Sequence, residues 1–216
     1  MTATVVQQLP DGDQWLYELK LDGYRAEIIK HGDRVQIRSR NEKDLTAAYP
    51  RVAAAAKALN AASAVVDGEI VAVDANGRPS FQALQHRSGF PDHTTVFYAF
   101  DLLHLDGEDL TRRPLSERRA LLPKVLKDSG LLLSQDLPGT ASQVTDAVQP
   151  PGLEGVIAKR RDSRYDAGQR SGVWVKLKLD KQQEFVIGGV PRSSRRQTCA
   201  IGRPGAVGGL HVPRGH

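Results

Sequence analysis

The sequence predicts an α+β domain with antiparallel sheets, and three features of the chain lead to this class. Several segments alternate apolar and polar residues, as half-buried strands do. Two of these segments flank the short loop His31-Gly32-Asp33, which is typical of a β-hairpin. Helical segments are mixed with the strands along the chain, and mixed elements with hairpins favour an α+β packing.

The first half of the chain is expected to hold several strands and one helix. Residues 50–59 are rich in alanine and suit the helix. The turn Ala75-Asn76-Gly77 follows the last strand of this half. The strands are placed at residues 14–20, 24–30, 34–39 and 64–74.

The second half is expected to begin with a strand rich in aromatic and branched side chains, at residues 95–103. A helix starts in Pro114-Leu115-Ser116, with Ser116 as its N-cap, and runs to about residue 127. Residues 184–190 are either the last strand of this domain or the first strand of another. The remaining elements are a shorter helix at 140–148 and strands at 155–159 and 173–178.

The composition fits a soluble enzyme domain. A chain of 216 residues is long enough for one or two domains with a real core. Hydrophobic residues make up 40% of it, and no apolar run approaches the length that spans a bilayer. The N-terminus lacks the charged and apolar regions of a secretory signal. The single cysteine, Cys199, excludes an intramolecular disulfide and a multi-cysteine metal site, so we expect a cytoplasmic protein.

The net charge of +5 is concentrated in the tail. Five of the 30 lysines and arginines, and none of the 25 acids, follow Glu184, so the preceding residues are balanced. The overall basicity therefore says little about nucleic-acid binding by the body of the chain. Each arginine that could form a basic face there also fits a solvated surface charge; the candidates are Arg112, Arg113, Arg118, Arg119, Arg160 and Arg161.

The strongest functional signal is the run Tyr17-Glu18-Leu19-Lys20-Leu21-Asp22-Gly23-Tyr24-Arg25. Lys20 ends a strand-like stretch, and Glu18 shares its face because alternate strand residues point the same way. A lysine amine is a nucleophile only in its neutral form, which burial and nearby cations favour. Arg25 offers a fork for ribose or phosphate oxygens. By itself the run fits either a nucleotide-attacking lysine or a hairpin with mixed surface charge.

This run resembles the nucleotidyl-lysine motif of the covalent nucleotidyltransferases, namely ATP-dependent DNA ligases, RNA ligases and mRNA capping enzymes. Five ordered motifs are a far stronger signal than any single one. The segments that resemble the later ligase motifs are Val66-Asp67-Gly68-Glu69-Ile70, Tyr98-Ala99-Phe100-Asp101-Leu102-Leu103, Leu153-Glu154-Gly155-Val156-Ile157-Ala158-Lys159 and Trp174-Val175-Lys176-Leu177-Lys178. The connecting segments are most similar to those of the bacterial ligase D group, and they are Gly77-Arg78-Pro79-Ser80-Phe81-Gln82-Ala83-Leu84-Gln85 and Arg161-Asp162-Ser163-Arg164-Tyr165. The resemblance covers residues 1–190.

The resemblance implies the DNA ligase/mRNA capping enzyme-like nucleotidyltransferase fold, which is ATP-grasp-like, with ATP held between two antiparallel sheets. Residues 1–183 would form the adenylation domain, and residues 184–190 the start of an OB-fold domain. Residues 191–216 are rich in Arg, Gly and Pro and are expected to be disordered. We interpret this tail as a truncated or frameshifted end that impairs self-adenylation; an arginine-rich arm that binds DNA backbone is the alternative.

The resemblance also implies a role for each motif. Lys20 attacks the α-phosphate of ATP and becomes lysyl-AMP, while Lys176 and Lys178 share a strand face and reach the same phosphate. Phe100 would stack on the adenine, although it fits an ordinary core residue equally well, and Lys159 either joins the lysines or is a surface lysine. Glu154 is the expected ligand of Mg²⁺ or Mn²⁺. The other expected nucleotide contacts are Glu18 and the backbone around Leu19 at the adenine, Arg25 and Glu69 at the ribose, and Arg40 at AMP or the nick 5′-phosphate.

The function implied is that of an ATP-dependent DNA ligase which seals 3′-hydroxyl/5′-phosphate nicks in duplex DNA during repair and recombination. Its partners would be nicked double-stranded DNA and, by family analogy alone, Ku. We expect a cytoplasmic, nucleoid-associated monomer that does not bind membranes. Two alternatives stay open: an RNA ligase or GTP-using capping enzyme, and a non-catalytic module that binds nucleotide or DNA.

Overall fold

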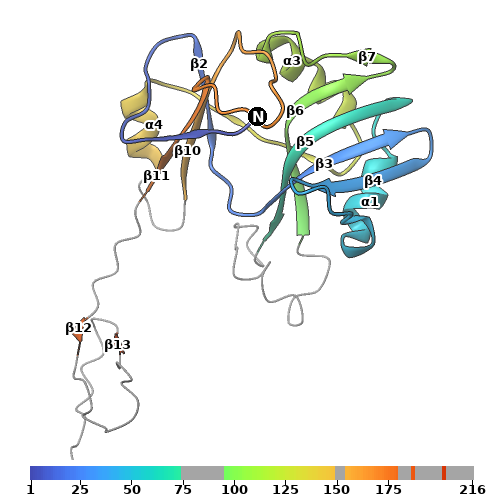
Figure 1. The fold of residues 1–216 in the computed structure, drawn as a ribbon, viewed down its shortest axis with the longest axis horizontal. Helices are drawn as coiled ribbons and strands as arrows, with labels where there is room; N and C mark the ends of the chain where they lie inside the picture. The colour runs from blue at the N-terminus through green and yellow to red at the C-terminus, as the bar shows by residue number, and fades with distance from the viewer. Residues whose placement is uncertain (74–94, 149–153, 180–185, 188–200, 203–216) are drawn as a thin grey trace, which may run out of the picture. The chain divides into compact units, whose positions relative to one another are not determined.

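A computed structural model describes residues 1–73, 95–148 and 154–179, together with residues 186–187 and 201–202. The chain divides into two compact units, Met1–Leu179 and Asp180–His216. The first unit contains two β-sheets and their flanking helices (Figure 1). Within the described residues, no helix is both long and apolar enough to cross a membrane.

The first sheet has five strands in the order β1-β11-β10-β2-β9. Its strands are β1 (Thr4–Val6), β2 (Trp15–Leu19), β9 (Asp136–Leu137), β10 (Gly155–Arg160) and β11 (Trp174–Lys178). In the register of the three central strands, Glu18 lies opposite Ile157, which lies opposite Lys176. Residues directly opposite each other share a face of the sheet, and neighbouring residues along a strand point to opposite faces. Alternate residues of each sequence motif therefore lie on opposite sides of this sheet.

One side of the first sheet is apolar and packs against α4 (Ala141–Val148). The buried residues of this cluster are Leu9, Tyr17, Ala141, Val144, Val148, Val156, Ala158 and Val175. The other side carries Glu18, Lys159 and Lys176, because these residues alternate with the apolar ones. The charged side faces the second sheet.

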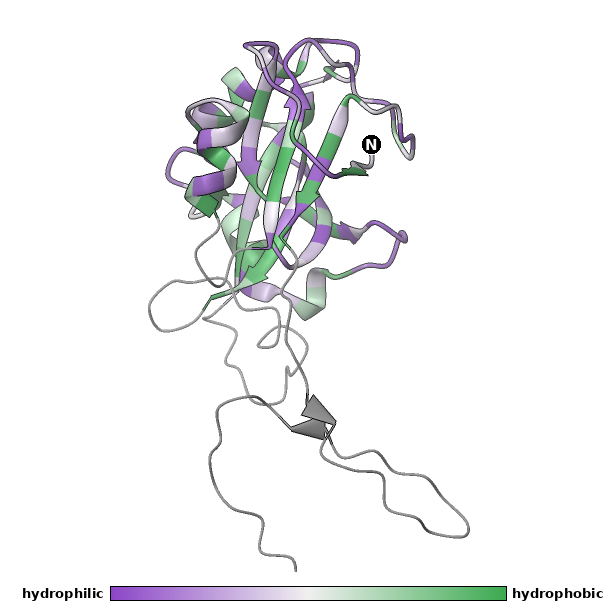
Figure 2. Ribbon diagram, turned by 90° about the vertical axis from the view of Figure 1, so that its left-hand side faces the viewer, coloured by the Kyte–Doolittle hydropathy of each residue, from purple (hydrophilic) through white to green (hydrophobic). Residues whose placement is uncertain are grey.

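The second sheet has six strands, five of them in the order β4-β3-β5-β6-β7, and β8 pairs with β6. They are β3 (Tyr24–His31), β4 (Arg34–Ser39), β5 (Ser63–Ala72), β6 (Thr95–Leu105), β7 (Glu108–Asp109) and β8 (Leu132–Leu133). The main core lies between this sheet and the helices α1 (Pro50–Lys57) and α3 (Leu115–Leu126). Figure 2 shows the strands banded with hydrophobic residues, whereas the loops at the top of the view are mostly hydrophilic.

A smaller apolar cluster joins the facing sides of the two sheets. It contains Leu103 of β6, Leu115 of α3 and Trp174 of β11, together with Met1 and Tyr165. The ring of Phe100 on β6 packs edge-on against Trp174, with centroids 6.2 Å apart. This cluster fixes the charged side of the first sheet against the second sheet.

The predicted fold class is confirmed, and each predicted strand or helix between residues 14 and 178 is present with small shifts at its ends. The strands β1, β7, β8 and β9 are two or three residues long, too short for alternation to show. The sheets are also not purely antiparallel, because β1 pairs with β11 and β8 with β6 in parallel. The predicted N-cap was wrong: α3 begins at Leu115 after Pro114 at the cap position, and Ser116 lies in its first turn.

The C-terminal unit is described at two places only. Val186–Ile187 (β12) pairs antiparallel with Ile201–Gly202 (β13), and the sequence did not predict the second of these strands. The turn at residues 75–77, most of the 184–190 strand and the remainder of the tail lie outside the described residues. The domain boundaries drawn from the sequence beyond residue 183 therefore stay predictions.

Candidate active site

Lys20 follows directly after β2, at the edge of the charged side of the first sheet. Its backbone N–H donates a hydrogen bond of 2.9 Å to the carbonyl of Gly155, and its ammonium forms an ion pair with Glu154. The two side chains are 15% and 28% exposed, so solvent and ligands can reach both. Residues 20 and 154 are thus brought together by the pairing of β2 with β10.

Gly155 explains why this approach is so close. Its φ angle is +145°, and a Cβ built there would lie 2.0 Å from the carbonyl oxygen of Leu177 on β11. Only glycine fits such a position without moving the neighbouring strand. The sequence Glu154-Gly155 therefore places the carboxylate and the carbonyl that both contact Lys20.

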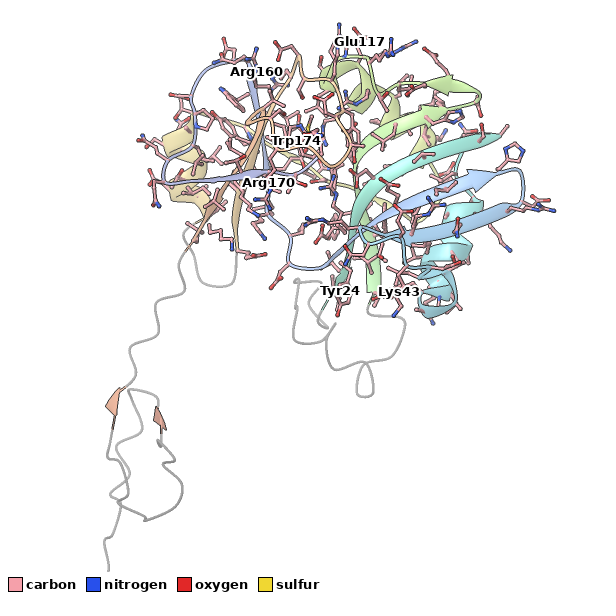
Figure 3. The ribbon with its side chains drawn as sticks, viewed as in Figure 1. Tyr24, Lys43, Glu117, Arg160, Arg170 and Trp174 are labelled. Atoms are coloured by element: carbon pink, nitrogen blue, oxygen red, sulfur yellow. The ribbon has the colours of Figure 1, made fainter. Side chains whose placement is uncertain are left out.

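Lys176 and Lys178 lie on β11 beside Lys20. In the register, Lys176 is opposite Ile157 and Lys178 is opposite Gly155, whose carbonyl holds the Lys20 backbone. Burial lowers the pKa of Lys176 below its ordinary value, and the positive charges of Lys20 and Lys178 lower it further. The prediction that these three lysines form one group is supported by this geometry, and the exposed Arg170 adds a fourth cation nearby (Figure 3).

Arg25 projects from β3 between the sheets and is held mainly by Asp67 of β5. Its Nε and Nη2 atoms donate to the two carboxylate oxygens at 3.0 and 2.6 Å, and its Nη1 atom donates to the carbonyl of Met1. The hydroxyl of Tyr165 donates to the same carboxylate at 2.9 Å. The guanidinium also lies over the ring of Phe100, 5.5 Å from its centroid. Arg25 is therefore a fixed cation at this site.

Glu69 lies on the strand position opposite Arg25. Burial raises the pKa of its carboxyl to about 7, and the negative charges of Asp67 and Glu154 act in the same direction. Lys20 and Arg25 oppose this effect without cancelling it. A carboxyl that titrates near neutrality beside a candidate nucleophile is a common feature of functional sites.

Glu18, the expected adenine contact, lies in a buried network of polar side chains. Glu18 is 2% exposed, and its carboxylate accepts hydrogen bonds of 3.0 Å from Lys159 and from Ser134 and pairs with Arg119 at 2.7 Å. The side chain of Leu19 packs with the α4 cluster, so only its backbone can face the site.

Lys159, expected either among the phosphate-binding lysines or at the surface, is buried in the structure. Lys159 is 1% exposed and lies opposite Trp174, two positions along β11 from Lys176. Its Nζ atom lies 4.2 Å from the ring centroid of Phe100 and 4.3 Å from that of Trp174. Burial lowers its pKa, while Glu18 opposes the shift. Lys159 is a buried cation enclosed by two aromatic rings.

Arg40 is exposed and lines a pocket of about 840 Å³ that also includes Arg25 and Glu69. Tyr24 and Lys43 line the same pocket and lie near each other in Figure 3. Lys20 is not part of its lining, so this large pocket adjoins the lysine group through Arg25 and Glu69. It is wide enough to hold a nucleotide-sized ligand.

Sequence reasoning missed the structural importance of Arg118 and Arg119 and placed them among candidates for a DNA-binding face. Both are buried on α3, Arg118 paired with Asp101 at 2.8 Å and Arg119 with Glu18. A signal was available, because these positions follow Leu115 by three and four residues and precede Leu122 by four and three, the spacing of a buried helix face. Asp67 and Tyr165 were missed as well, since their link to Arg25 spans distant parts of the chain.

The residues present suit a divalent cation bound together with a phosphate. Among the described residues there is no group of three or more His, Cys, Asp or Glu side chains that could enclose a metal ion. Mg²⁺, however, is commonly held by one or two carboxylates plus substrate phosphates. The Oε2 atom of Glu154 is buried and finds no hydrogen-bond partner in the described part of the chain, and Glu69 lies near enough for their charges to interact.

Comparison with known proteins gives a consistent answer. Residues 2–178 match the family model described as the ATP dependent DNA ligase domain. The non-homologous end joining DNA repair protein LigD of Mycobacterium tuberculosis is 43% identical over 200 residues, covering 90% of this chain and 26% of that protein. A probable DNA ligase of Beutenbergia cavernae is 36% identical over 204 residues, covering 90% of this chain and 40% of that protein. The chain thus spans well under half the length of these relatives.

Solved structures agree. The fold matches mycobacterial DNA ligase D complexed with ATP and MES, with a TM-score of 0.72 and 40% identity over 86% of this chain and 63% of that one. It also matches the ligase domain of M. tuberculosis LigD, with a TM-score of 0.71 and 39% identity over 86% of this chain and 62% of that one. Five ordered motifs, the grouped lysines and a family match over residues 2–178 lead to one conclusion: the chain belongs to the ATP-dependent DNA ligase family and carries its ligase domain, similar to that of LigD proteins.

Proposed function

We propose that this domain catalyses the nucleotidyl transfer of an ATP-dependent DNA ligase, with Lys20 as the nucleophile. The observation that carries the proposal is the grouping of Lys20, paired with the carboxylate of Glu154, with Lys176 and Lys178, whose charges interact. Phosphoryl transfer needs an aligned nucleophile and positive charge around the phosphate, and this arrangement offers both.

In the first step the neutral amine of Lys20 attacks the α-phosphorus of ATP. The new N–P bond forms as the bond between phosphorus and the bridging oxygen breaks, and pyrophosphate leaves. Lys176 and Lys178 neutralise the charge that develops on the phosphate oxygens. A divalent cation, Mg²⁺ or Mn²⁺, bound by Glu154 would neutralise further negative charge on the polyphosphate.

The nucleoside is assigned to the space between the sheets. Phe100 offers an aromatic surface to the adenine, Arg25 and Glu69 lie where they can hold the ribose, and Arg40 lines the adjoining pocket beside them. The support is that Arg25, Glu69 and Phe100 lie on strands of the second sheet, that the charge of Lys20 acts on Glu69, and that Arg40, just after β4, shares a pocket with Arg25 and Glu69. Glu18 and Lys159 are buried and act indirectly, because Glu18 binds Lys159 and Lys159 lies against the ring of Phe100.

In the second stage the AMP passes to the 5′-phosphate of a DNA nick, and the 3′-hydroxyl displaces it to seal the strand. Nicked duplex DNA as the substrate, and a role in repair, are inferred from relatives named as DNA ligases and as end-joining repair proteins. A cooperation with Ku, a monomeric state and association with the nucleoid in the cytoplasm are part of the same proposal.

Mass spectrometry of the intact protein after incubation with ATP and Mg²⁺ tests the first step. We expect a gain equal to one AMP, absent in Lys20→Ala and retained in Lys57→Ala, which alters an exposed lysine on α1. A gain with GTP instead of ATP would favour a capping-type enzyme. If wild type forms no adduct with any nucleotide, Lys20 is not a nucleophile in this chain and the proposal fails.

The second stage is tested with a pre-adenylated DNA nick and its RNA counterpart. Sealing of the DNA nick by wild type, without added ATP, supports a DNA ligase. Sealing of the RNA substrate alone would indicate an RNA ligase instead, and sealing of neither would limit the chain to the first step.

A further inference from the structure

Two buried carboxylates lie directly opposite each other on neighbouring strands of the second sheet. Asp67 of β5 and Asp101 of β6 are register partners, and both side chains are fully buried. Buried carboxylates this close repel each other, so each needs a cation of its own. Arg25 pairs with Asp67 at 2.6 Å, and Arg118 pairs with Asp101 at 2.8 Å. The two ion pairs therefore lie side by side in the sheet.

The side chain of Tyr165 contacts both of these ion pairs. Its hydroxyl donates to the Oδ2 atom of Asp67 at 2.9 Å and accepts from the Nη2 atom of Arg25 at 3.3 Å. The guanidinium of Arg118 lies over its ring, 5.9 Å from the centroid. Trp174 packs edge-on against the same ring, with centroids 6.1 Å apart. The position of the hydroxyl is thus fixed by packing around the ring.

The segment that carries Tyr165 is anchored by its backbone as well. The N–H of Tyr165 donates to the carbonyl of Thr111 at 2.8 Å, and the Nη1 atom of Arg118 donates to the carbonyl of Ser163 at 2.9 Å. Burial raises the pKa of the Tyr165 hydroxyl, and the negative charge of Asp67 raises it further. The hydroxyl therefore keeps its proton at neutral pH and remains a donor to Asp67.

These contacts decide which donor of Arg25 can meet a ligand. A guanidinium carries one N–H donor on Nε and two on each Nη atom. Asp67 accepts from Nε and Nη2, the Tyr165 hydroxyl accepts the second Nη2 donor, and the carbonyl of Met1 accepts from Nη1. Among the described residues, these hydrogen bonds leave the second Nη1 donor for a ligand. Arg25 also lines the pocket of about 840 Å³, to which the proposed function assigns the ribose.

We propose that Tyr165 is a positioning residue for the ribose, because it holds the Asp67–Arg25 pair in the orientation that presents the remaining Arg25 donor to a ribose hydroxyl. The inference rests on the proposed function, in which Arg25 meets the ribose of ATP. Tyr165 acts through Arg25 and does not itself touch the ligand.

The change Tyr165→Phe removes one oxygen atom and keeps the ring that packs against Arg118 and Trp174. Asp67 then loses a donor and draws the Arg25 guanidinium more strongly toward itself, while Arg25 loses an acceptor at Nη2. Both effects weaken the contact between Arg25 and the ribose. Losing one buried hydrogen bond to a charged group corresponds to about a tenfold change in an equilibrium constant.

The test compares two probes that divide the nucleotide site. AMP carries the ribose, whereas inorganic pyrophosphate is expected to meet only the lysine group, Lys20, Lys176 and Lys178. For Tyr165→Phe we expect the dissociation constant of AMP, measured by calorimetry, to rise about tenfold while that of pyrophosphate stays unchanged.

Deoxynucleotides give a readout that a merely structural role would not move. The dissociation constants of 2′-deoxy-AMP and 3′-deoxy-AMP are measured for wild type and for Tyr165→Phe. For the nucleotide that lacks the hydroxyl held by Arg25, the ratio of variant to wild type should fall to about one, because a contact that is already missing cannot be lost again. The same ratio for AMP and for both deoxynucleotides would overturn the positioning role.

Tyr17→Phe is the matched control. Tyr17 is also a buried tyrosine, and its hydroxyl donates to the carbonyl of Pro10 at 2.8 Å. Its removal deletes a buried hydrogen bond on β2 and leaves the Asp67–Arg25 pair unchanged. Both variants should lose stability in urea, but Tyr17→Phe should bind AMP and pyrophosphate as wild type does. An AMP-selective loss of the same size in Tyr17→Phe would contradict the proposal.

Arg118→Lys keeps the test open if Tyr165→Phe does not fold. It leaves the Tyr165 hydroxyl in place but removes the guanidinium that lies over the ring and holds the carbonyl of Ser163. We expect a smaller loss of AMP affinity that again depends on the ribose hydroxyl. Equal losses for AMP and pyrophosphate in either variant would show a general loss of packing and overturn the inference.

These binding measurements separate the inference from the proposed function. A wild-type protein that binds AMP but forms no lysyl-AMP would refute the proposed reaction and leave the comparison of probes intact. A wild-type protein that binds neither AMP nor ATP would overturn both.

Discussion

The ammonium of Lys20 is paired with the carboxylate of Glu154, so the proposed nucleophile and the proposed cation ligand contact each other directly. The second oxygen of Glu154 is buried and has no hydrogen-bond partner among the residues that the structure describes. Binding of a nucleotide with its cation would give that oxygen a partner and draw the carboxylate away from Lys20. Such an exchange of partners would couple ligand binding to the release of the proposed nucleophile.

Glu154→Gln separates these two functions of the carboxylate. We expect formation of lysyl-AMP to slow by about 100-fold, because a neutral amide neither binds the divalent cation well nor balances the lysine group. In the absence of ATP, Lys20 should react faster with an amine-acylating reagent, since its ion pair is lost. Peptide mapping with Lys57 as the internal standard measures this, and an unchanged Lys20 signal would contradict the importance of the pair.

Lys176→Met and Lys178→Met are expected to differ in severity. Lys176 is partly buried and Lys178 is exposed, and a charge acts more strongly where less water screens it. The rate of AMP transfer should fall by about 100- to 1000-fold in Lys176→Met and by less in Lys178→Met. Single-turnover labelling with ATP measures both rates, and equal losses would assign the two lysines equal roles.

Glu69 should make the stability of the ligand-free domain depend on pH. Its pKa is raised from 4.5 to about 7 on folding, so the native state keeps a proton that the unfolded state has lost. The contribution of this bound proton to the free energy of unfolding is fully present below about pH 4.5 and is lost as the pH rises through about 7. Its size is about 3 kcal/mol. Relative to wild type, Glu69→Gln should gain stability in urea between pH 5 and pH 8.

The matched control for this measurement is Glu117→Gln, which changes an exposed carboxylate in the first turn of α3. It should follow the wild-type pH dependence. A Glu69→Gln variant that also follows wild type would mean that folding does not raise the pKa of Glu69.

Gly155→Ala tests the close approach of β10 to β11. The new Cβ would meet the carbonyl of Leu177 at 2.0 Å at a φ angle that favours glycine, so we expect a loss of about 3 kcal/mol or more in the free energy of unfolding. Gly172 also has a positive φ, +77°, but its Cβ would meet nothing within 4 Å. Gly172→Ala should cost about 1 kcal/mol. Equal losses in urea denaturation would show that backbone conformation alone matters.

The lysine side of the site could be predicted because strand alternation fixes it locally. Once β2 and β11 are recognised, alternation alone puts Glu18 with Lys20 and Lys176 with Lys178. The longer strands were predictable for the same reason, and the helix at residues 50–59 from its alanine content, whereas β1 and β9 carry too few residues to show a period.

The base side could not be predicted, because its contacts join distant parts of the chain. The sequence shows that Glu18 shares a face with Lys20, but its partners Arg119 and Ser134 come from more than a hundred residues away. Whether an arginine on a helix is solvated or buried depends on which face the helix packs, and that is decided by the sheet beneath it. Arg119 and Arg118 were misjudged for this reason.

The position of β2 inside its sheet has a consequence for the timing of folding. β2 pairs with β10 on one side and β9 on the other, so residues near position 18 find their neighbours only after residues near 136 and 157 have been made. Contacts this distant in sequence form late, because a long loop must close first. A ribosome-bound chain that ends before β10 therefore cannot assemble the lysine group, and the proposed reaction with ATP would begin only when nearly the whole domain has emerged.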